Sequence, residues 1–210
     1  RYIGANDKAA VSNAVHTSMM LSVFLGVIGA VFGIIITPNV LRSMGNQGNL
    51  LTLATQYAKI YFLSLPFTAI TNFSIAIIQA NGDTKTPLFF LSISGLINVI
   101  LILIFVLVFK MNVDGVALAT AISKVLAATL AVRALARRTD ACKLIFKEMR
   151  IYPKELGKII QHGFPAGLQS CLFALSNVFT TSAINSFHSE TVIAGNGAAQ
   201  NIQGLMKCVN

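Results

Sequence analysis

The apolar stretches of this sequence contain no aspartate and no glutamate. Seven acidic residues lie in the polar segments between or beside those stretches: Asp7, Asp83, Asp114, Asp140, Glu148, Glu155 and Glu190. Catalysis by a pair of carboxylates therefore has no candidate site inside the apolar stretches. The sequence also has no phosphate-binding glycine loop, nucleophile elbow or dinucleotide fingerprint, so its motifs do not indicate an enzyme.

Cysteine and histidine are scarce, and neither forms a cluster. The three cysteines are far apart without a CxxC motif, which argues against a disulfide framework and a zinc site. The three histidines each stand alone near the end of an apolar stretch. We therefore expect no metal or cofactor, cysteines that fill small spaces and histidines that cap helices at a membrane interface. These residues are Cys142, Cys171, Cys208, His16, His162 and His188.

Charged residues are rare, and long uncharged runs take their place. Only 11% of the residues are charged, 55% are hydrophobic, and the mean hydropathy is +0.72. Several uncharged runs exceed the ~20 residues that cross a bilayer as a helix. They cover 9–41, 60–82, 86–109 and 159–189, and further spans are expected at 115–134 and from Thr191 onward. Because such continuous apolarity does not suit barrel strands, the sequence predicts an all-α integral membrane protein, a polytopic helical bundle.

The basic residues are unevenly distributed. Much of the net charge of +9 lies in residues 133–161, where Lys and Arg far outnumber Asp and Glu. Positive charge retained in a short loop marks the cytoplasmic side of a membrane protein. Alternation of the spans then places 1–13 and 81–85 on the same side. This distribution argues against nucleic acid as a partner and favours contact with anionic membrane lipids, so we expect a multi-pass protein of the cell membrane.

Glycine and proline predict two packing features. Gly26, Gly29 and Gly33 are spaced three and four residues apart, so they share one helix face where a neighbouring backbone can approach closely. Pro66 lies in the body of the second span, where it removes a backbone hydrogen bond and predicts a bend.

Polar side chains inside the apolar stretches are the candidates for a substrate or ion path. Each must face protein or a wet cavity rather than hydrocarbon. Lys124 stands out because it lies roughly 15 Å along its helix from the outer end, near the bilayer midplane. A hydrogen bond that only fixes helix packing, or for Lys124 snorkelling or a structural ion pair, is the alternative interpretation. The candidates are Asn72, Asn98, Thr120, Lys124 and Asn177, and Asn185 is a weaker one.

Three runs of sequence resemble the multidrug and toxic compound extrusion (MATE) transporters. They are IYFLSLPFTAITNFSIAIIQANGDTKTPLFFLSISGLINVIL, GVALATAISK and GFPAGLQSCLFALSNVF. The resemblance implies a monomer with twelve helices in two six-helix lobes. It assigns 1–135 to the last four helices of the first lobe, 136–162 to a basic cytoplasmic linker and 163–210 to the first helices of the second lobe. The absence of an initiator Met and the apolar end of the sequence predict an internal fragment.

The resemblance also implies a function, which is the bacterial efflux of amphipathic organic cations by antiport with Na⁺ or H⁺. Asn72, Asn98 and Thr120 match polar positions that line the first-lobe cavity in family members. The sequence departs from the family pattern at four other positions. It has Ile102 where many members carry Asp, and it lacks the Glu that some members carry near the position of Phe173. It also has Lys124 where Gln is common and Gln79 where a basic residue is common.

These departures leave other functions open. The coupling carboxylate must come from a helix upstream of Arg1, or the coupling differs. A flippase for lipid-linked sugars shares the superfamily architecture and typically has basic residues in its cavity, where this sequence offers only Lys124. Ile102 in place of Asp would also suit a membrane scaffold, or a decayed transporter, that no longer transports.

Overall fold

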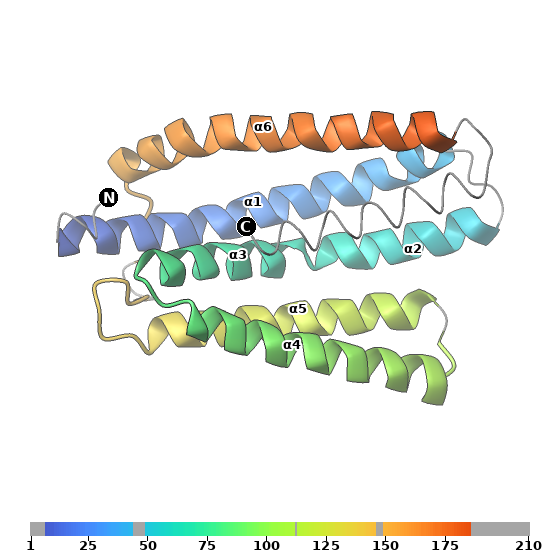
Figure 1. Cartoon of the computed structure of the whole chain (residues 1–210), viewed down its shortest axis with the longest axis horizontal. Helices are drawn as coiled ribbons and strands as arrows, with labels where there is room; N and C mark the ends of the chain where they lie inside the picture. The colour runs from blue at the N-terminus through green and yellow to red at the C-terminus, as the bar shows by residue number, and fades with distance from the viewer. Residues whose placement is uncertain (1–6, 44–48, 112, 146–148, 186–210) are drawn as a thin grey trace. The chain divides into compact units, whose positions relative to one another are not determined.

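The computed structural model describes residues 7–43, 49–111, 113–145 and 149–185. These residues form helices and connecting segments without a strand, which confirms the all-α fold (Figure 1). Two compact units are present, 1–157 and 158–210, and the boundary between them falls inside the last helix. The helices are α1 (Lys8–Ser43), α2 (Asn49–Leu63), α3 (Leu65–Ala80), α4 (Lys85–Leu103), the π-helical turn η1 (Ile104–Val108), α5 (Val113–Ala136) and α6 (Pro153–Asn185).

Several of these helices are long and apolar enough to span a bilayer. By length and composition they are α1, α4 together with η1, and α5, and the bent pair α2 and α3 makes a fourth span. Over its described residues α6 does not meet the same criterion, because polar residues such as Gln161 and Gln169 interrupt its apolar character. The span expected from Thr191 lies outside the described residues. The expected multi-pass arrangement is confirmed.

The second span bends where Pro66 was expected to bend it. α2 ends at Leu63, α3 begins at Leu65, and their axes meet at 42°. Pro66 occupies the first turn of α3, where its missing N–H interrupts the hydrogen-bond ladder between the two helices. The hydroxyl of Ser64 donates to the carbonyl of Tyr61 at 2.7 Å, so this polar side chain is satisfied at the break.

The glycine face of α1 packs against this bend. A Cβ atom added to Gly26 would lie 2.5 Å from the backbone Cα of Pro66, and one added to Gly33 would collide with the ring of Phe62. Only residues without a side chain permit this approach. At Gly29 the space is larger, since an added Cβ would meet a side-chain carbon of Leu65 at 3.5 Å. The predicted close contact is therefore confirmed, and the closest approach to another helix's backbone is at Gly26.

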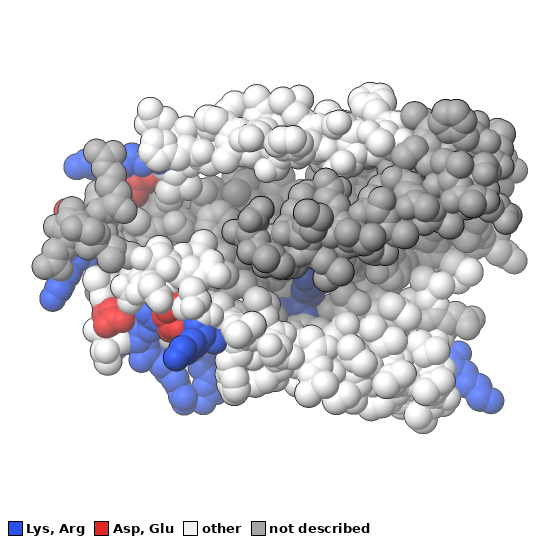
Figure 2. All heavy atoms as spheres, viewed as in Figure 1, with Lys and Arg blue, Asp and Glu red and all other residues white. Residues whose placement is uncertain are grey.

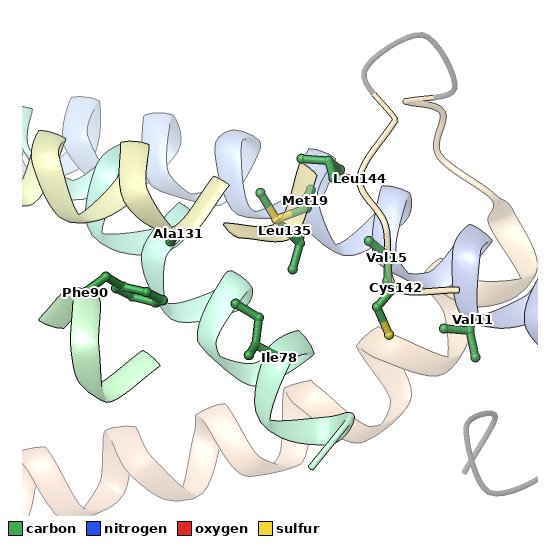
Figure 3. Packing of buried hydrophobic residues seen from close by; sticks show 9 residues of the cluster. All are labelled: Val11, Val15, Met19, Ile78, Phe90, Ala131, Leu135, Cys142 and Leu144. Carbon is green, nitrogen blue, oxygen red and sulfur yellow. The ribbon is translucent and has the colours of Figure 1, made fainter. Parts of the chain in front are cut away.

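The apolar core of the first unit lies near the end that carries the α3–α4 turn (Figure 3). It joins α1, α3, α4 and α5 with the segment that follows α5. Cys142, in that segment, is 2% exposed, as expected of a packing residue, whereas Cys171 on α6 is exposed. The core residues are Val11, Val15, Met19, Ile78, Phe90, Ala131, Leu135, Cys142 and Leu144.

Polar contacts join the α3–α4 turn to the segment after α5. Asp83 accepts hydrogen bonds from the backbone N–H and the hydroxyl of Thr86 at 3.0 and 2.7 Å and forms an ion pair with Arg138. The Thr86 hydrogen bonds hold the pKa of Asp83 below its ordinary value, and the charge of Arg138 acts in the same direction. Asn81 donates to Asp140 at 3.1 Å. Lys and Arg gather around this end (Figure 2), so segments expected on the cytoplasmic side lie together.

Gly26→Ala should destabilise the protein, because its Cβ would meet backbone that cannot move without separating α1 from α3. We expect a loss of about 1–3 kcal/mol, typical of overpacking, seen as a lower thermal midpoint of the whole protein purified in detergent. Gly29→Ala is the matched control, because it has room for the methyl group. Equal midpoints for the two variants would contradict the close contact at Gly26.

Candidate functional site

A cavity of about 410 Å³ lies between α2, α3, α4 and α5 in the first unit. Its position within apolar spans makes its polar lining the notable feature. Both α3 and α5 contribute three polar residues, α4 contributes two and α2 contributes a tyrosine. The polar lining residues are Tyr61, Thr68, Thr71, Asn72, Ser94, Asn98, Thr120, Ser123 and Lys124.

Helical spacing explains why these side chains meet. On α5, Thr120, Ser123 and Lys124 are three and four residues apart, so they lie on one face of the helix. On α4, Ser94 and Asn98 are four residues apart and share a face in the same way. Thr68, Thr71 and Asn72 repeat the α5 spacing on α3. Each helix thus carries one polar stripe, and the stripes converge on the cavity.

The serine and threonine hydroxyls of the lining donate their protons to carbonyl groups of the helix backbone. Thr71 donates to the carbonyl of Phe67 at 2.8 Å, and Thr120 donates to Val116 at 2.9 Å. Ser94 differs, because it donates across to the Ser123 carbonyl at 2.6 Å and thereby links α4 to α5. The oxygen lone pairs of these hydroxyls remain able to accept hydrogen bonds from the cavity side.

The amides and the ammonium group are not held in this way. Within the described part of the chain, no hydrogen bond or ion pair engages the side chains of Asn72, Asn98 or Lys124. Asn72 is exposed, and Asn98 and Lys124 are half-buried. Together with the hydroxyl of Tyr61, these three groups supply the donors that the cavity can present to a ligand, and Lys124 supplies the charge.

Among the lining residues there is a cation and no carboxylate. Lys124 carries the charge, and each acidic residue that the structure describes lies elsewhere. Ile102, one turn after Asn98 on α4, is half-buried and does not line the cavity. The described cavity therefore has a positive electrostatic balance.

The structure brings four of the five predicted site residues together: Asn72, Asn98, Thr120 and Lys124 line the cavity. The fifth, Asn177, lies on α6 in the second unit and is exposed. The prediction omitted Tyr61 and the hydroxyl residues Thr68, Thr71, Ser94 and Ser123. For Thr68, Ser94 and Ser123 the signal in the sequence was a spacing of three or four residues from a predicted site residue on the same helix. Thr71 is the neighbour of Asn72, and Tyr61 lies on α2, where no site residue was predicted.

A polar cavity enclosed by apolar, membrane-spanning helices is typical of helical membrane transporters, in which intramembrane polar groups mark the path of a substrate. Comparison with known proteins gives the family. A family model described as MatE matches residues 1–104.

Curated relatives carry multidrug names. The chain is 28% identical over 198 residues to the probable multidrug resistance protein YoeA of Bacillus subtilis, covering 91% of this chain and 43% of YoeA. It is 29% identical over 178 residues to the multidrug export protein MepA of Staphylococcus saprophyticus, covering 85% of this chain and 40% of MepA. The chain therefore spans less than half the length of these relatives.

Solved structures agree in fold. The inward-facing conformation of a multidrug resistance MATE family transporter of the MOP superfamily matches with a TM-score of 0.83 at 25% identity, covering 98% of this chain and 47% of that chain. The outward-facing conformation matches with a TM-score of 0.87 at 25% identity, covering 98% and 46%. The chain is therefore similar in sequence and fold to the MATE family. Since that is a family of membrane transporters, the membrane location is confirmed and an enzyme is not indicated.

The cavity should be accessible to water, whereas the outer face of α4 should not. In the whole protein with its native cysteines replaced by serine, Asn98→Cys should react with a charged, membrane-impermeant thiol reagent, because the reactive thiolate forms in contact with water. Val99→Cys is the control, since Val99 is 54% exposed on an apolar surface of the same helix. We expect at least about a tenfold difference in labelling rate in membranes. Equal rates would show that the cavity is dry.

Proposed function

We propose that this chain is part of a multidrug exporter of the cell membrane, which expels amphipathic organic cations in exchange for Na⁺ or H⁺. In this proposal 1–135 belong to one lobe, 136–162 form the cytoplasmic linker, 163–210 begin the second lobe, and the protein works as a monomer. The observation that carries the proposal is the polar cavity between α2 and α5. Its volume falls in the range of small-molecule sites, ~300–1,000 Å³.

The names of the relatives support the export of small molecules. YoeA is named as a probable multidrug resistance protein and MepA as a multidrug export protein. A lining that combines polar groups with apolar surface, as in this cavity, suits amphipathic cargo, since it can take up an apolar body and a polar end in several orientations.

Coupling to a cation requires a group that the described residues do not place at the cavity. A transporter that exchanges its cargo for a cation needs a site whose charge differs between the two loaded states. The amides of Asn72 and Asn98 do not titrate. We therefore propose that the coupling carboxylate is supplied by a part of the whole protein outside the described residues, and that Asn98 and Thr120 support it as neutral neighbours.

An efflux assay tests the proposal. The complete reading frame, expressed in a drug-sensitive bacterial host, should accelerate loss of a fluorescent organic cation from cells, and collapse of the Na⁺ and H⁺ gradients should stop this loss. Asn98→Leu should lower the efflux rate at least about tenfold without preventing insertion, because it removes a cavity amide and keeps the helix apolar. Val99→Leu, on the outer face, should transport normally. Equal retention of dye with and without expression would contradict the exporter hypothesis and favour a membrane scaffold that does not transport.

Lys124 should set the charge preference of the cargo. At an effective dielectric constant of about 20, a unit charge ~8 Å away changes the binding free energy of an ion by about 2 kcal/mol. Lys124→Gln should therefore favour cationic over anionic cargo by roughly tenfold or more, and Lys124→Arg should not. The measurement is competition between a cationic and an anionic fluorescent substrate. If Lys124→Gln leaves the rate and the substrate range unchanged, the lysine is structural. Strong transport of anions by the wild type would favour the flippase.

A further inference from the structure

The described parts of the segment between α5 and α6 contact α1. Cys142 and Leu144 are 2% and 3% exposed and belong to the apolar core of the first unit. Glu155, in the first turn of α6, is 7% exposed. A flexible tether as long as 137–152 would let its ends separate by roughly 20 Å. In this protein the described ends of the segment are instead packed on the unit that contains α1.

His16 holds the first part of this segment. Its Nδ1 lies 2.7 Å from the carbonyl oxygen of Ser12, and its Nε2 lies 3.1 Å from the backbone nitrogen of Ile145. A carbonyl only accepts and a backbone N–H only donates, so the ring is neutral with its proton on Nδ1. The ring is 1% exposed, which corrects the expectation that His16 caps a helix at the interface. Its role is to accept the Ile145 N–H.

Thr17 holds the second part. Its hydroxyl donates to the carbonyl of Asn13 at 2.8 Å and accepts the backbone N–H of Tyr152 at 3.1 Å, and the residue is fully buried. The carbonyl of Tyr152 in turn accepts the N–H of Leu156 at 2.9 Å, which closes the first turn of α6. Tyr152 therefore connects α1 to the first turn of α6 directly, through its N–H on one side and its carbonyl on the other.

We propose that His16 and Thr17 are positioning residues that fix Ile145 and Tyr152 to α1, so that the first turn of α6 moves together with α1 during transport. The inference about movement rests on the proposed function, and the inference about attachment does not. Neither residue lines the cavity, so the pair acts on the rate of the conformational cycle and not on cargo binding.

Hydrogen exchange of the purified whole protein tests the attachment. Thr17→Val removes the hydroxyl at nearly constant shape, and Thr17→Ser keeps it. Loss of one net hydrogen bond should make the amides around Tyr152 exchange about fivefold faster in Thr17→Val. His16→Leu should do the same around Ile145, whereas His16→Gln keeps an acceptor and should restore most of the protection. Unchanged exchange in both Thr17→Val and His16→Leu would overturn the proposal.

Efflux per inserted molecule tests the movement. Thr17→Val should lower the maximal efflux rate at least about threefold and leave the cargo concentration for half-maximal rate unchanged, and Thr17→Ser should restore the rate. A residue that served folding alone would lower the amount of protein and not the rate per molecule. Faster exchange with an unchanged rate would overturn the coupling of α6 to α1. If the wild type exports no probe, the proposed function fails, and the exchange measurement still decides the attachment.

Discussion

Hydrocarbon offers no hydrogen-bond partner, and the arrangement of the first unit follows from that constraint. The spans meet it in two ways. Hydroxyl residues such as Thr37 and Thr129 donate to carbonyls of their own helix. Their hydrogen bonds therefore need no partner from another helix. Groups that cannot do this, above all Asn98 and Lys124, face a shared cavity between α2 and α5. The cavity therefore contains the polar side chains whose hydrogen bonds cannot be made within their own helix.

The end of the unit that carries the α3–α4 turn is built differently. There, contacts between residues far apart in the sequence replace contacts within a helix. Arg138 pairs with Asp83, and Asn81 donates to Asp140, so the turn is fixed to the segment after α5. The apolar core packs beneath these contacts. The cavity is thus lined by helices that are joined firmly at one end, and changes in its shape must come from motion farther along them.

Much of this fold could be predicted from the sequence, because bilayer thickness and hydropathy determine which segments become spans. The bend at Pro66 and the close packing at Gly26 follow from single residues. Asn72, Asn98, Thr120 and Lys124 could be selected because a polar side chain inside a span must face protein or a wet cavity. The role of His16 could not be predicted. Its partner Ile145 is 129 positions away, and a lone histidine near a helix end looks the same in the sequence whether it meets lipid headgroups or a peptide N–H.

The hydroxyls that donate to backbone carbonyls have a consequence for the release of a ligand from the cavity. A binding site with unpaired buried donors pays a penalty whenever its ligand leaves, because each stranded N–H or O–H loses a bond. Thr71, Thr120 and Ser123 donate their protons to carbonyls of their own helices, so these hydroxyls do not need a ligand as hydrogen-bond acceptor. These hydroxyls can bind a ligand only by accepting hydrogen bonds through their oxygen lone pairs. Their own hydrogen bonds to the backbone stay intact when the ligand is released. Such a surface favours rapid release of a ligand over tight retention, which suits the proposed export.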